Sequence, residues 1–391
     1  MGTNWRLSQS NCLIQRDNRI EYEVLMNYPT PRPTIAEMVR YQPNLSVKKS
    51  QRIIRLSANE GAFGPSPKAK AVLTNIVENM HWYPEEEPVA LAEALGRKYS
   101  LDPSKMVFGC GSDELIMSIC QAFIGPDDEA IHSEYGFVMY PMSIKVAGGR
   151  PISAPDVNFK VNVEAILERI TDRTRVVFLA NPNNPTGSYL SRTEVNKLHR
   201  GLPNNILLVI DSAYAEFVVR NDYSDGSELV DNCDNVIMLR TFSKLYAMAG
   251  LRLGWGYGPA HVTDALHVVK QPFGANRAAV EAAIAAIDDQ EFIDKSVEHN
   301  LIWQPWTAAE FEKLGLKCLP SVTNFLMVKF PQKLGSTAED ASKYLSDRGI
   351  LTRGMSGYGA PEYLRLSIGT EEEMRTVVNT VAEFLDRVST N

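Results

Sequence analysis

Two glycine- or proline-rich segments have the composition of ligand-binding turns. In GCGSDEL (109–115), the glycines let backbone N–H groups approach an anion, and the start of a helix favours negative charge. Asp113 and Glu114 in the same turn would repel a phosphate unless they point away from it. NPNNPTG (181–187) contains two Asn-Pro steps that end a β-rich run. Each segment alone is more often a plain strand-to-helix turn, so neither identifies a site.

Two further segments place ionisable side chains directly after apolar runs. DSAYAEF begins with Asp211 after ILLVI, and an acid at the end of a buried strand is costly unless it is paired or bound to a ligand. TFSKLYAMAGLRLGWGYG follows NVIML and contains Ser243, Lys244 and, eight residues later, Arg252. A lone lysine is usually exposed to solvent. A lysine desolvated in a site instead has a lowered pKa and can act as a Schiff-base nucleophile.

Other catalytic and metal-binding patterns are missing from the sequence. It contains no GxxxxGK[ST], HExxH or GxSxG. The six histidines are dispersed and give no metal-ligand spacing, and the five cysteines are scattered and odd in number. We therefore expect neither a metal site nor a disulfide framework.

The elements that position these segments are predicted from apolar runs alternating with helical stretches. Short β-rich runs occur at 106–109, 129–133, 175–180, 206–210 and 235–239, and helices are predicted to begin near residues 112, 137, 191 and 260. This pattern predicts an α/β fold with a mainly parallel mixed sheet covered by helices on both faces.

The C-terminal hundred residues have a different pattern, which predicts a smaller α+β domain. Long helical stretches over 277–315 precede NFLMVKF (324–330), a helix near 338–348 and LRLSIG (364–369). Thr370 and Glu373 have capping-box spacing and begin an amphipathic final helix. We predict an arm with part of the small domain at 1–55, a large domain at 56–275 and a small C-terminal domain at 276–391.

Composition narrows the class of protein. The chain has 391 residues, a net charge of −7 and 44% hydrophobic residues, as expected of a folded soluble protein with more than one domain. This acidic balance disfavours a nucleic-acid partner, and no apolar run is long enough to span a bilayer. The N-terminal segment has no signal-peptide core. We expect a cytoplasmic protein without nucleic-acid or membrane partners.

The order of the four segments resembles fold-type I aminotransferases, which use pyridoxal 5′-phosphate (PLP). That order is a glycine-rich cradle, NNPTG, D-x-A-Y, and S-K followed by an arginine. LSANEGAFGPSP (56–67) and GILTRGMSGYGAPEYLRLSIGT (349–370) resemble histidinol-phosphate aminotransferases in particular. The resemblance extends from about residue 32 to the C-terminus. It implies a transaminase of histidine biosynthesis, converting L-histidinol phosphate and 2-oxoglutarate to imidazole-acetol phosphate and L-glutamate.

The resemblance implies roles for the residues around the cofactor ring. Lys244 would hold PLP covalently and later move the substrate Cα proton. Asp211 would pair with the pyridine nitrogen and keep it protonated, which makes the ring an electron sink. Asn184 and Tyr214 would hydrogen-bond the ring's 3-oxygen. Phe137 would stack on the ring, with Tyr135 as the alternative.

The resemblance also implies how the phosphate and the substrate are held. The cofactor phosphate would contact the helix start and two side chains: Gly111, Ser112, Asp113, Ser243 and Arg252. Tyr83 would reach the neighbouring subunit's cofactor phosphate, so the active site would be shared in a homodimer. The substrate would contact Arg365, Arg353, Asn59, Glu60 and Tyr41, the last from the arm. Two arginines suit a phosphate dianion better than one.

Two departures from the family pattern leave the substrate open. This chain reads EGAFGP where the family commonly has a proline at the second position after the Asn-Glu pair, and LYAMAG where many members have a smaller run after the lysine. An aromatic amino-acid aminotransferase and a phosphothreonine-type PLP decarboxylase therefore remain alternatives. A PLP-binding regulatory protein is disfavoured, because the first fifty residues show neither helix-turn-helix patterning nor a basic patch.

Overall fold

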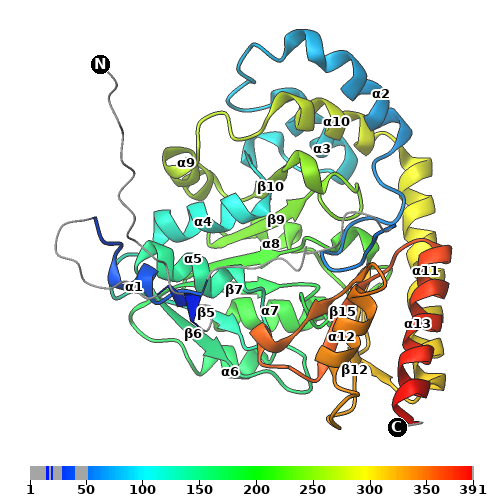
Figure 1. The fold of residues 1–391 in the computed structure, drawn as a ribbon. Helices are drawn as coiled ribbons and strands as arrows, with labels where there is room; N and C mark the ends of the chain where they lie inside the picture. Colours follow the sequence, from blue (N-terminus) through cyan, green and yellow to red (C-terminus); the bar gives the residue numbers. More distant parts are fainter. Residues whose placement is uncertain (1–14, 17–18, 21–28, 40–51, 390–391) are drawn as a thin grey trace, which may run out of the picture. The chain divides into compact units, whose positions relative to one another are not determined.

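The computed structural model describes residues 15–16, 19–20, 29–39 and 52–389 (Figure 1). The chain divides into two compact units, Met1–Pro43 and Asn44–Asn391. In the first unit, β1 (Gln15–Arg16) pairs antiparallel with β2 (Arg19–Ile20), and α1 (Pro33–Ala36) is a single turn of helix. The second unit contains every predicted site residue except Tyr41, which lies outside the described residues.

A seven-stranded sheet forms the centre of the second unit. Its spatial order is β4 (Met106–Gly109), β10 (Gly254–Tyr257), β9 (Val236–Thr241), β8 (Leu207–Asp211), β7 (Thr174–Ala180), β5 (Glu129–Ser133) and β6 (Arg150–Ala154). β10 is antiparallel to both of its neighbours, and every other pairing in this sheet is parallel. The predicted mainly parallel sheet is confirmed, and the sequence analysis missed β6 and β10.

Both faces of this sheet are buried, because successive residues of its strands enter different hydrophobic cores. Val176 and Phe178 pack into one core, whereas Val177 and Leu179 pack into the other. The first core is covered by α4 (Ser112–Phe123), α5 (Met139–Ala147) and α9 (Ala260–Val269). The second is covered by α2 (Pro67–Asn75), α3 (Val89–Tyr99), α6 (Val163–Leu167), α7 (Arg192–Gly201), α8 (Ser227–Asn232) and α10 (Arg277–Ile287).

Side-chain caps fix where several of these helices begin. The Ser66 hydroxyl accepts a hydrogen bond from the Ala69 N–H at the start of α2. Ser191 and Glu194 form a capping box at the start of α7, as the predicted helix start near residue 191 requires. Local sequence therefore determines the ends of these elements.

The C-terminal region forms a separate antiparallel sheet covered by long helices (Figure 1). Its strand order is β11 (Lys317–Cys318), β12 (Phe325–Lys329), β15 (Tyr363–Ser367) and β14 (Arg353–Gly354). The helices are α11 (Gln290–Lys313), α12 (Ala338–Ser346) and α13 (Glu371–Ser389). β3 (Ile54–Arg55) pairs in parallel with β13 (Ile350–Leu351), so residues near the start of this unit join the C-terminal region. The domain boundaries themselves stay a prediction.

The final helix has the predicted amphipathic character. The Thr370 N–H donates to Glu373 Oε2 (2.8 Å), and the Glu373 N–H donates back to Thr370 Oγ1 (3.4 Å). The predicted apolar stripe is buried at Met374, Val377 and Val381. These residues belong to the core formed with β12 and β15, which places the end of β15 next to the start of α13.

Candidate active site

The four chemistry-bearing segments lie where strands of the central sheet end. GCGSDEL follows β4, NPNNPTG follows β7, DSAYAEF starts at the last residue of β8, and TFSK continues from the end of β9. β7, β8 and β9 are adjacent and parallel, so their carboxyl ends share one edge of the sheet. This is the edge at which α/β folds bind ligands.

A backbone cradle occupies the turn between β4 and α4. Gly111 has a φ of +82°, and a Cβ there would clash with the Arg252 guanidinium. A Cβ at Gly254 in β10 would clash with the Ser112 backbone. Gly254 is therefore needed for the close approach of β10 to this turn, and Gly111 is needed for its positive φ. The turn leaves backbone N–H groups at the α4 N-terminus, where an anion is favoured.

The two acids of this turn have different positions. Glu114 accepts hydrogen bonds from the Cys110 N–H and from the Gln271 N–H (3.0 Å), so its carboxylate stabilises the turn. Asp113 Oδ2 lies 3.4 Å from Arg252 Nη2. The predicted repulsion of an anion is thus relieved, because one acid is held by backbone amides and the other lies beside a guanidinium.

Arg252 also connects the cradle to the segment after β9. Its Nη1 donates to Ser243 Oγ (3.3 Å) and to the Ala249 carbonyl (3.0 Å). Two of the predicted phosphate ligands, Ser243 and Arg252, therefore contact each other and lie beside Gly111.

Asp211 is a buried carboxylate at the end of β8, only 6% exposed. Its Oδ2 accepts from the Tyr140 hydroxyl (2.8 Å), and its Oδ1 accepts from the Ala213 N–H (3.3 Å). Burial raises its pKa to about 6, and the Tyr140 hydrogen bond opposes that rise. An acid in this position is what the sequence analysis predicted from its place after an apolar strand.

Lys244 is half-buried, and its Nζ donates to the Ala58 carbonyl (3.0 Å). Burial, and after it the positive charge of Arg365, lowers the pKa of Lys244 to about 8. A larger fraction of its amine is therefore neutral at physiological pH than for an ordinary lysine. This is the state that reacts as a nucleophile.

Tyr214 and Asn59 connect this lysine to the segment after β3. Asn59 Nδ2 donates to the Tyr214 hydroxyl (2.8 Å), and Lys244 Nζ lies 5.7 Å from the centre of the Tyr214 ring. Burial raises the Tyr214 pKa to about 12, so its hydroxyl keeps a proton that it can donate to another acceptor. Glu60 is half-buried, and its negative charge partly opposes the lowering of the Lys244 pKa.

Arg365 and Arg353 are cross-strand neighbours in the small sheet. They are paired residues of the antiparallel strands β15 and β14, so their side chains point to the same face. Arg365 is 6% exposed and contacts Asn184 Oδ1 and the Ser57 carbonyl (2.8 Å). Within the described residues its buried Nε has no hydrogen-bond acceptor.

The aromatic residues of the prediction have separate positions. Phe137 meets Tyr140 edge-on, with 5.8 Å between ring centres. Because the Tyr140 hydroxyl donates to Asp211, Phe137 lies close to that hydrogen-bonded pair. Tyr135 instead packs against Phe159 at 4.6 Å. This arrangement favours Phe137 over Tyr135 as the ring that neighbours Asp211.

Tyr83 lies on the surface. Its side chain is 79% exposed and stacks on Phe273, with 4.8 Å between ring centres. Within the described residues, its side chain makes no hydrogen bond to the cradle of its own chain. Such an exposed aromatic is available to another molecule.

Tyr140 and Asn324 are site residues that the sequence analysis missed. Tyr140 lies in an apolar helix and cannot be distinguished from a core aromatic by sequence. Asn324 donates from Nδ2 to the Asn59 carbonyl (3.1 Å) and the Glu60 carbonyl (3.3 Å), fixing the segment beside Lys244. Its position as the polar first residue of the run NFLMVKF (324–330) was the available signal.

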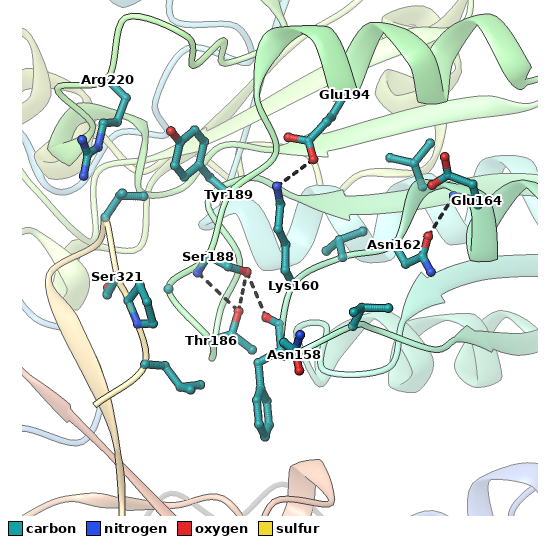
Figure 2. A pocket seen from close by; sticks show the side chains of 18 of the residues that line it. Asn158, Lys160, Asn162, Glu164, Thr186, Ser188, Tyr189, Glu194, Arg220 and Ser321 are labelled. Carbon is teal, nitrogen blue, oxygen red and sulfur yellow. Dashed lines mark hydrogen bonds and ion pairs between the residues drawn. The ribbon is translucent and has the colours of Figure 1, made fainter. Parts of the chain in front are cut away.

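A separate cavity of about 730 Å³ lies beside the NPNNPTG turn (Figure 2). Its lining includes Thr186–Ser188, residues 157–164 and residues 319–322. The polar groups drawn in Figure 2 mainly satisfy one another: Lys160 pairs with Glu194 (2.7 Å), and Ser188 Oγ donates to the Phe159 carbonyl (3.0 Å). The predicted site residues do not line this cavity, so it is distinct from the Lys244 site.

The described ranges contain neither a cluster of metal ligands nor a membrane-spanning helix. Nowhere in residues 29–39 and 52–389 do three or more His, Cys, Asp or Glu side chains gather as metal ligands. Among the helices of these ranges, none is both long and apolar enough to cross a bilayer.

The strand order of the central sheet and the site formed by Lys244 and Asp211 at its edge define a class of protein. Residues 51–381 match the family described as aminotransferase class I and II, and the chain belongs to that family. The α/β architecture with a second, smaller sheet is the architecture of its solved relatives.

Individual relatives carry a more specific name. A histidinol-phosphate aminotransferase from Paramagnetospirillum magneticum is 46% identical, covering 92% of this chain and 99% of the relative. Another from Rhodopseudomonas palustris is 43% identical, covering 92% of this chain and 99% of the relative. The crystal structure of histidinol-phosphate aminotransferase from Sinorhizobium meliloti in complex with pyridoxal-5′-phosphate has a TM-score of 0.85 at 27% identity. It covers 93% of this chain and 99% of that one.

Proposed function

We propose that the protein is a PLP-dependent transaminase of histidine biosynthesis, acting in the cytoplasm. It would convert L-histidinol phosphate and 2-oxoglutarate to imidazole-acetol phosphate and L-glutamate. Relatives at 46% and 43% identity over almost the full chain carry the name histidinol-phosphate aminotransferase. The Sinorhizobium meliloti relative was solved in complex with PLP, which supports the same cofactor here.

The described residues fit PLP. The turn at Gly111 has no room for a Cβ and presents helix N-terminal amides beside Arg252, as a phosphate requires. Asp211 is a buried acid without a cationic partner at hydrogen-bond distance among the described residues, which suits a protonated ring nitrogen. Lys244 supplies a partly neutral amine.

When bound, PLP supplies an electron sink that stabilises negative charge at the substrate Cα. Lys244 Nζ would bind the cofactor covalently and then hold and move the Cα proton. Asp211 would hold the proton of the ring nitrogen. Tyr214 and Asn184 would donate hydrogen bonds to the 3-oxygen and orient the ring, while Phe137 would pack on its face.

The observation that carries the substrate assignment is the pairing of Arg353 with Arg365. Their side chains share one face of the small sheet, and Arg365 also contacts Asn184 of the cofactor site. A phosphate dianion has enough acceptor oxygens and charge to bind two guanidinium groups, whereas a carboxylate is suited to one. Arg365 would also bind the glutamate carboxylate in the other half-reaction, and Asn59 and Glu60 would border the substrate.

The test is a half-reaction on the PLP-loaded enzyme, followed by the change in cofactor absorbance. We expect rapid conversion with L-histidinol phosphate and with L-glutamate, and slow conversion with L-phenylalanine. In Arg353→Gln the rate with histidinol phosphate should fall about tenfold or more, and the rate with glutamate should change little. Rapid reaction with phenylalanine and none with histidinol phosphate would assign the enzyme to aromatic transamination, and carbon dioxide release without keto-acid formation would assign it to decarboxylation.

We also propose that the enzyme is a homodimer with shared active sites. The segment 77–89 carries the exposed apolar side chains Val77 (67%), Met80 (70%), Trp82 (59%), Tyr83 (79%) and Val89 (60%). Such a concentration of exposed large apolar residues is typical of an interaction surface. Tyr83 would reach the partner subunit's cofactor phosphate, and Tyr41 would reach a substrate site from the arm.

A further inference from the structure

A tyrosine outside the predicted site makes the shortest side-chain contact to Asp211. Tyr140 lies in the first turn of α5 and is 1% exposed. Its ring stacks on Phe178 with 4.9 Å between ring centres and an interplanar angle of 11°. Its hydroxyl donates to Asp211 Oδ2 at 2.8 Å. The stacked ring fixes the direction of that hydroxyl.

The hydrogen bonds that Asp211 accepts leave its carboxylate able to accept one more from a ligand. Oδ2 accepts from Tyr140 and Oδ1 accepts from the Ala213 N–H, so both oxygens are oriented while each keeps a lone pair. Burial raises the pKa of the Tyr140 hydroxyl well above 10, so Tyr140 donates a hydrogen bond and keeps its proton. Tyr140 therefore does not exchange its proton with Asp211, and the proton that Asp211 can share is one between its carboxylate and a bound ligand.

Opposing groups around Asp211 make this hydrogen bond decisive for its charge. Burial and the nearby Asp113 carboxylate favour the neutral acid. Tyr140, the Ala213 N–H and the Lys244 ammonium favour the carboxylate, and Tyr140 is the largest of these three. Tyr214 and Arg365 are the other ionisable groups nearby. The Tyr214 hydroxyl accepts from Asn59, and the charge of Arg365 lowers the pKa of both Lys244 and Tyr214.

We propose that Tyr140 is a positioning residue that keeps Asp211 anionic and directed at the ring nitrogen of the cofactor. This inference rests on the proposed function, because it needs a ligand with a protonated ring nitrogen. Without the Tyr140 hydroxyl, Asp211 holds a proton more readily, and the ring nitrogen loses its charged partner.

The test compares two buried tyrosines that both donate to an aspartate. Tyr140→Phe removes one hydroxyl at the site. Tyr257→Phe removes the hydroxyl that donates to Asp231 from the far end of β10, where Tyr257 is 1% exposed. The dissociation constant of PLP from each apoprotein is measured across the acidic and neutral pH range, and thermal unfolding confirms that each variant is folded.

In the wild type, PLP binding should weaken on acidification as Asp211 takes up a proton near its pKa of about 6. In Tyr140→Phe we expect that inflection to move up by about one pH unit, so the affinity should fall about twofold at neutral pH and about tenfold near pH 5, below both inflections. Tyr257→Phe should leave both quantities unchanged. An unmoved inflection in Tyr140→Phe with tight PLP binding would overturn the inference and leave the proposed function intact.

A cofactor analogue separates positioning from packing. 1-Deaza-pyridoxal phosphate replaces the ring nitrogen by carbon, so it has no proton to share with Asp211. The wild type and Tyr140→Phe should bind this analogue with equal affinity. An equal loss of affinity for PLP and for the analogue would make Tyr140 a packing residue and overturn the inference. A wild-type protein that binds neither compound would refute the proposed function itself.

Discussion

Burial shifts the pKa values of two site residues, Asp211 and Lys244, in opposite directions. Burial raises the pKa of Asp211 to about 6 and lowers that of Lys244 to about 8. Each group is therefore less stable in its charged form than it would be in water, and a ligand that stabilises both charges would gain from their preorganisation. The site is thus built at the expense of the stability of the empty protein.

Replacing Asp211 by Asn should stabilise the apoprotein at neutral pH. The folded pKa of about 6 lies above the ordinary 3.8, so the penalty is complete above about pH 6 and disappears as the pH falls below 3.8. That interval corresponds to at most about 3 kcal/mol, and Asn has one acceptor oxygen where Asp211 has two, so one accepted hydrogen bond is lost and we expect a gain of about 1–2 kcal/mol. Urea unfolding at neutral and at acidic pH measures it. A gain that persists below the ordinary pKa would show that the carboxylate charge is not its cause.

The rate at which the apoprotein binds PLP covalently should rise with pH through a midpoint of about 8. The neutral Lys244 amine is the reactive form, and burial lowers its pKa to that value from an ordinary 10.5. Hydride reduction followed by mass spectrometry locates the modified lysine, and Lys244→Ala should yield no modified protein. A midpoint near that of an ordinary lysine would contradict the desolvated environment.

At the scale of elements, the segment 58–61 and the turn after β9 determine where Lys244 lies. Ala58 accepts the hydrogen bond from Lys244 Nζ, and Asn324 fixes the Asn59 and Glu60 carbonyls. Gly61 then passes close to this turn, because a Cβ on Gly61 would lie 2.6 Å from the Ala247 Cβ and 3.1 Å from the Lys244 carbonyl oxygen. The missing side chain lets the two segments touch.

Gly61→Ala should therefore reduce transaminase turnover about tenfold or more, because overpacking displaces the backbone of Lys244. Gly250→Ala is the matched control, since a Cβ there meets nothing within 4 Å and its backbone has no positive φ. Steady-state kinetics and thermal unfolding distinguish a displaced lysine from a general loss of folding. Equal turnover in the two variants would show that the close contact at Gly61 does not determine the position of Lys244.

At the scale of the whole molecule, the proposed shared site predicts complementation between two defective variants. Tyr83→Ala removes the residue offered to the partner, and Lys244→Ala removes the lysine of the subunit's own site. In a mixed dimer one site regains both groups, with Lys244 from one subunit and Tyr83 from the other. We expect either variant alone to be poorly active at limiting PLP and the subunit-exchanged mixture to recover activity. No recovery in a mixture shown to contain hybrid dimers would exclude a shared site.

Local sequence predicted those elements whose apolar runs are buried on both sides. β4 and β5 occupy the predicted residues, and the positions of Asp211 and Lys244 after such strands follow from the same pattern. β10 was missed because its glycines at 254 and 256 are required by close neighbours that only the fold supplies. Tyr140 was missed for the same reason, since its partner is 71 residues away.

The pairing of β14 with β15 makes the proposed substrate preference depend on the length of the segment that connects them. Arg353 faces Arg365 because two short strands meet in one register, and residues 355–362 connect them. Side chains alternate between the faces of a strand, so a one-residue shift of β14 would turn Arg353 to the opposite face. Inserting or deleting one residue in this connection could therefore change which anion is accepted while every ligand-contacting side chain keeps its identity. Under the proposed function, the preference for a phosphate would depend on the number of residues between β14 and β15 as well as on the two arginines.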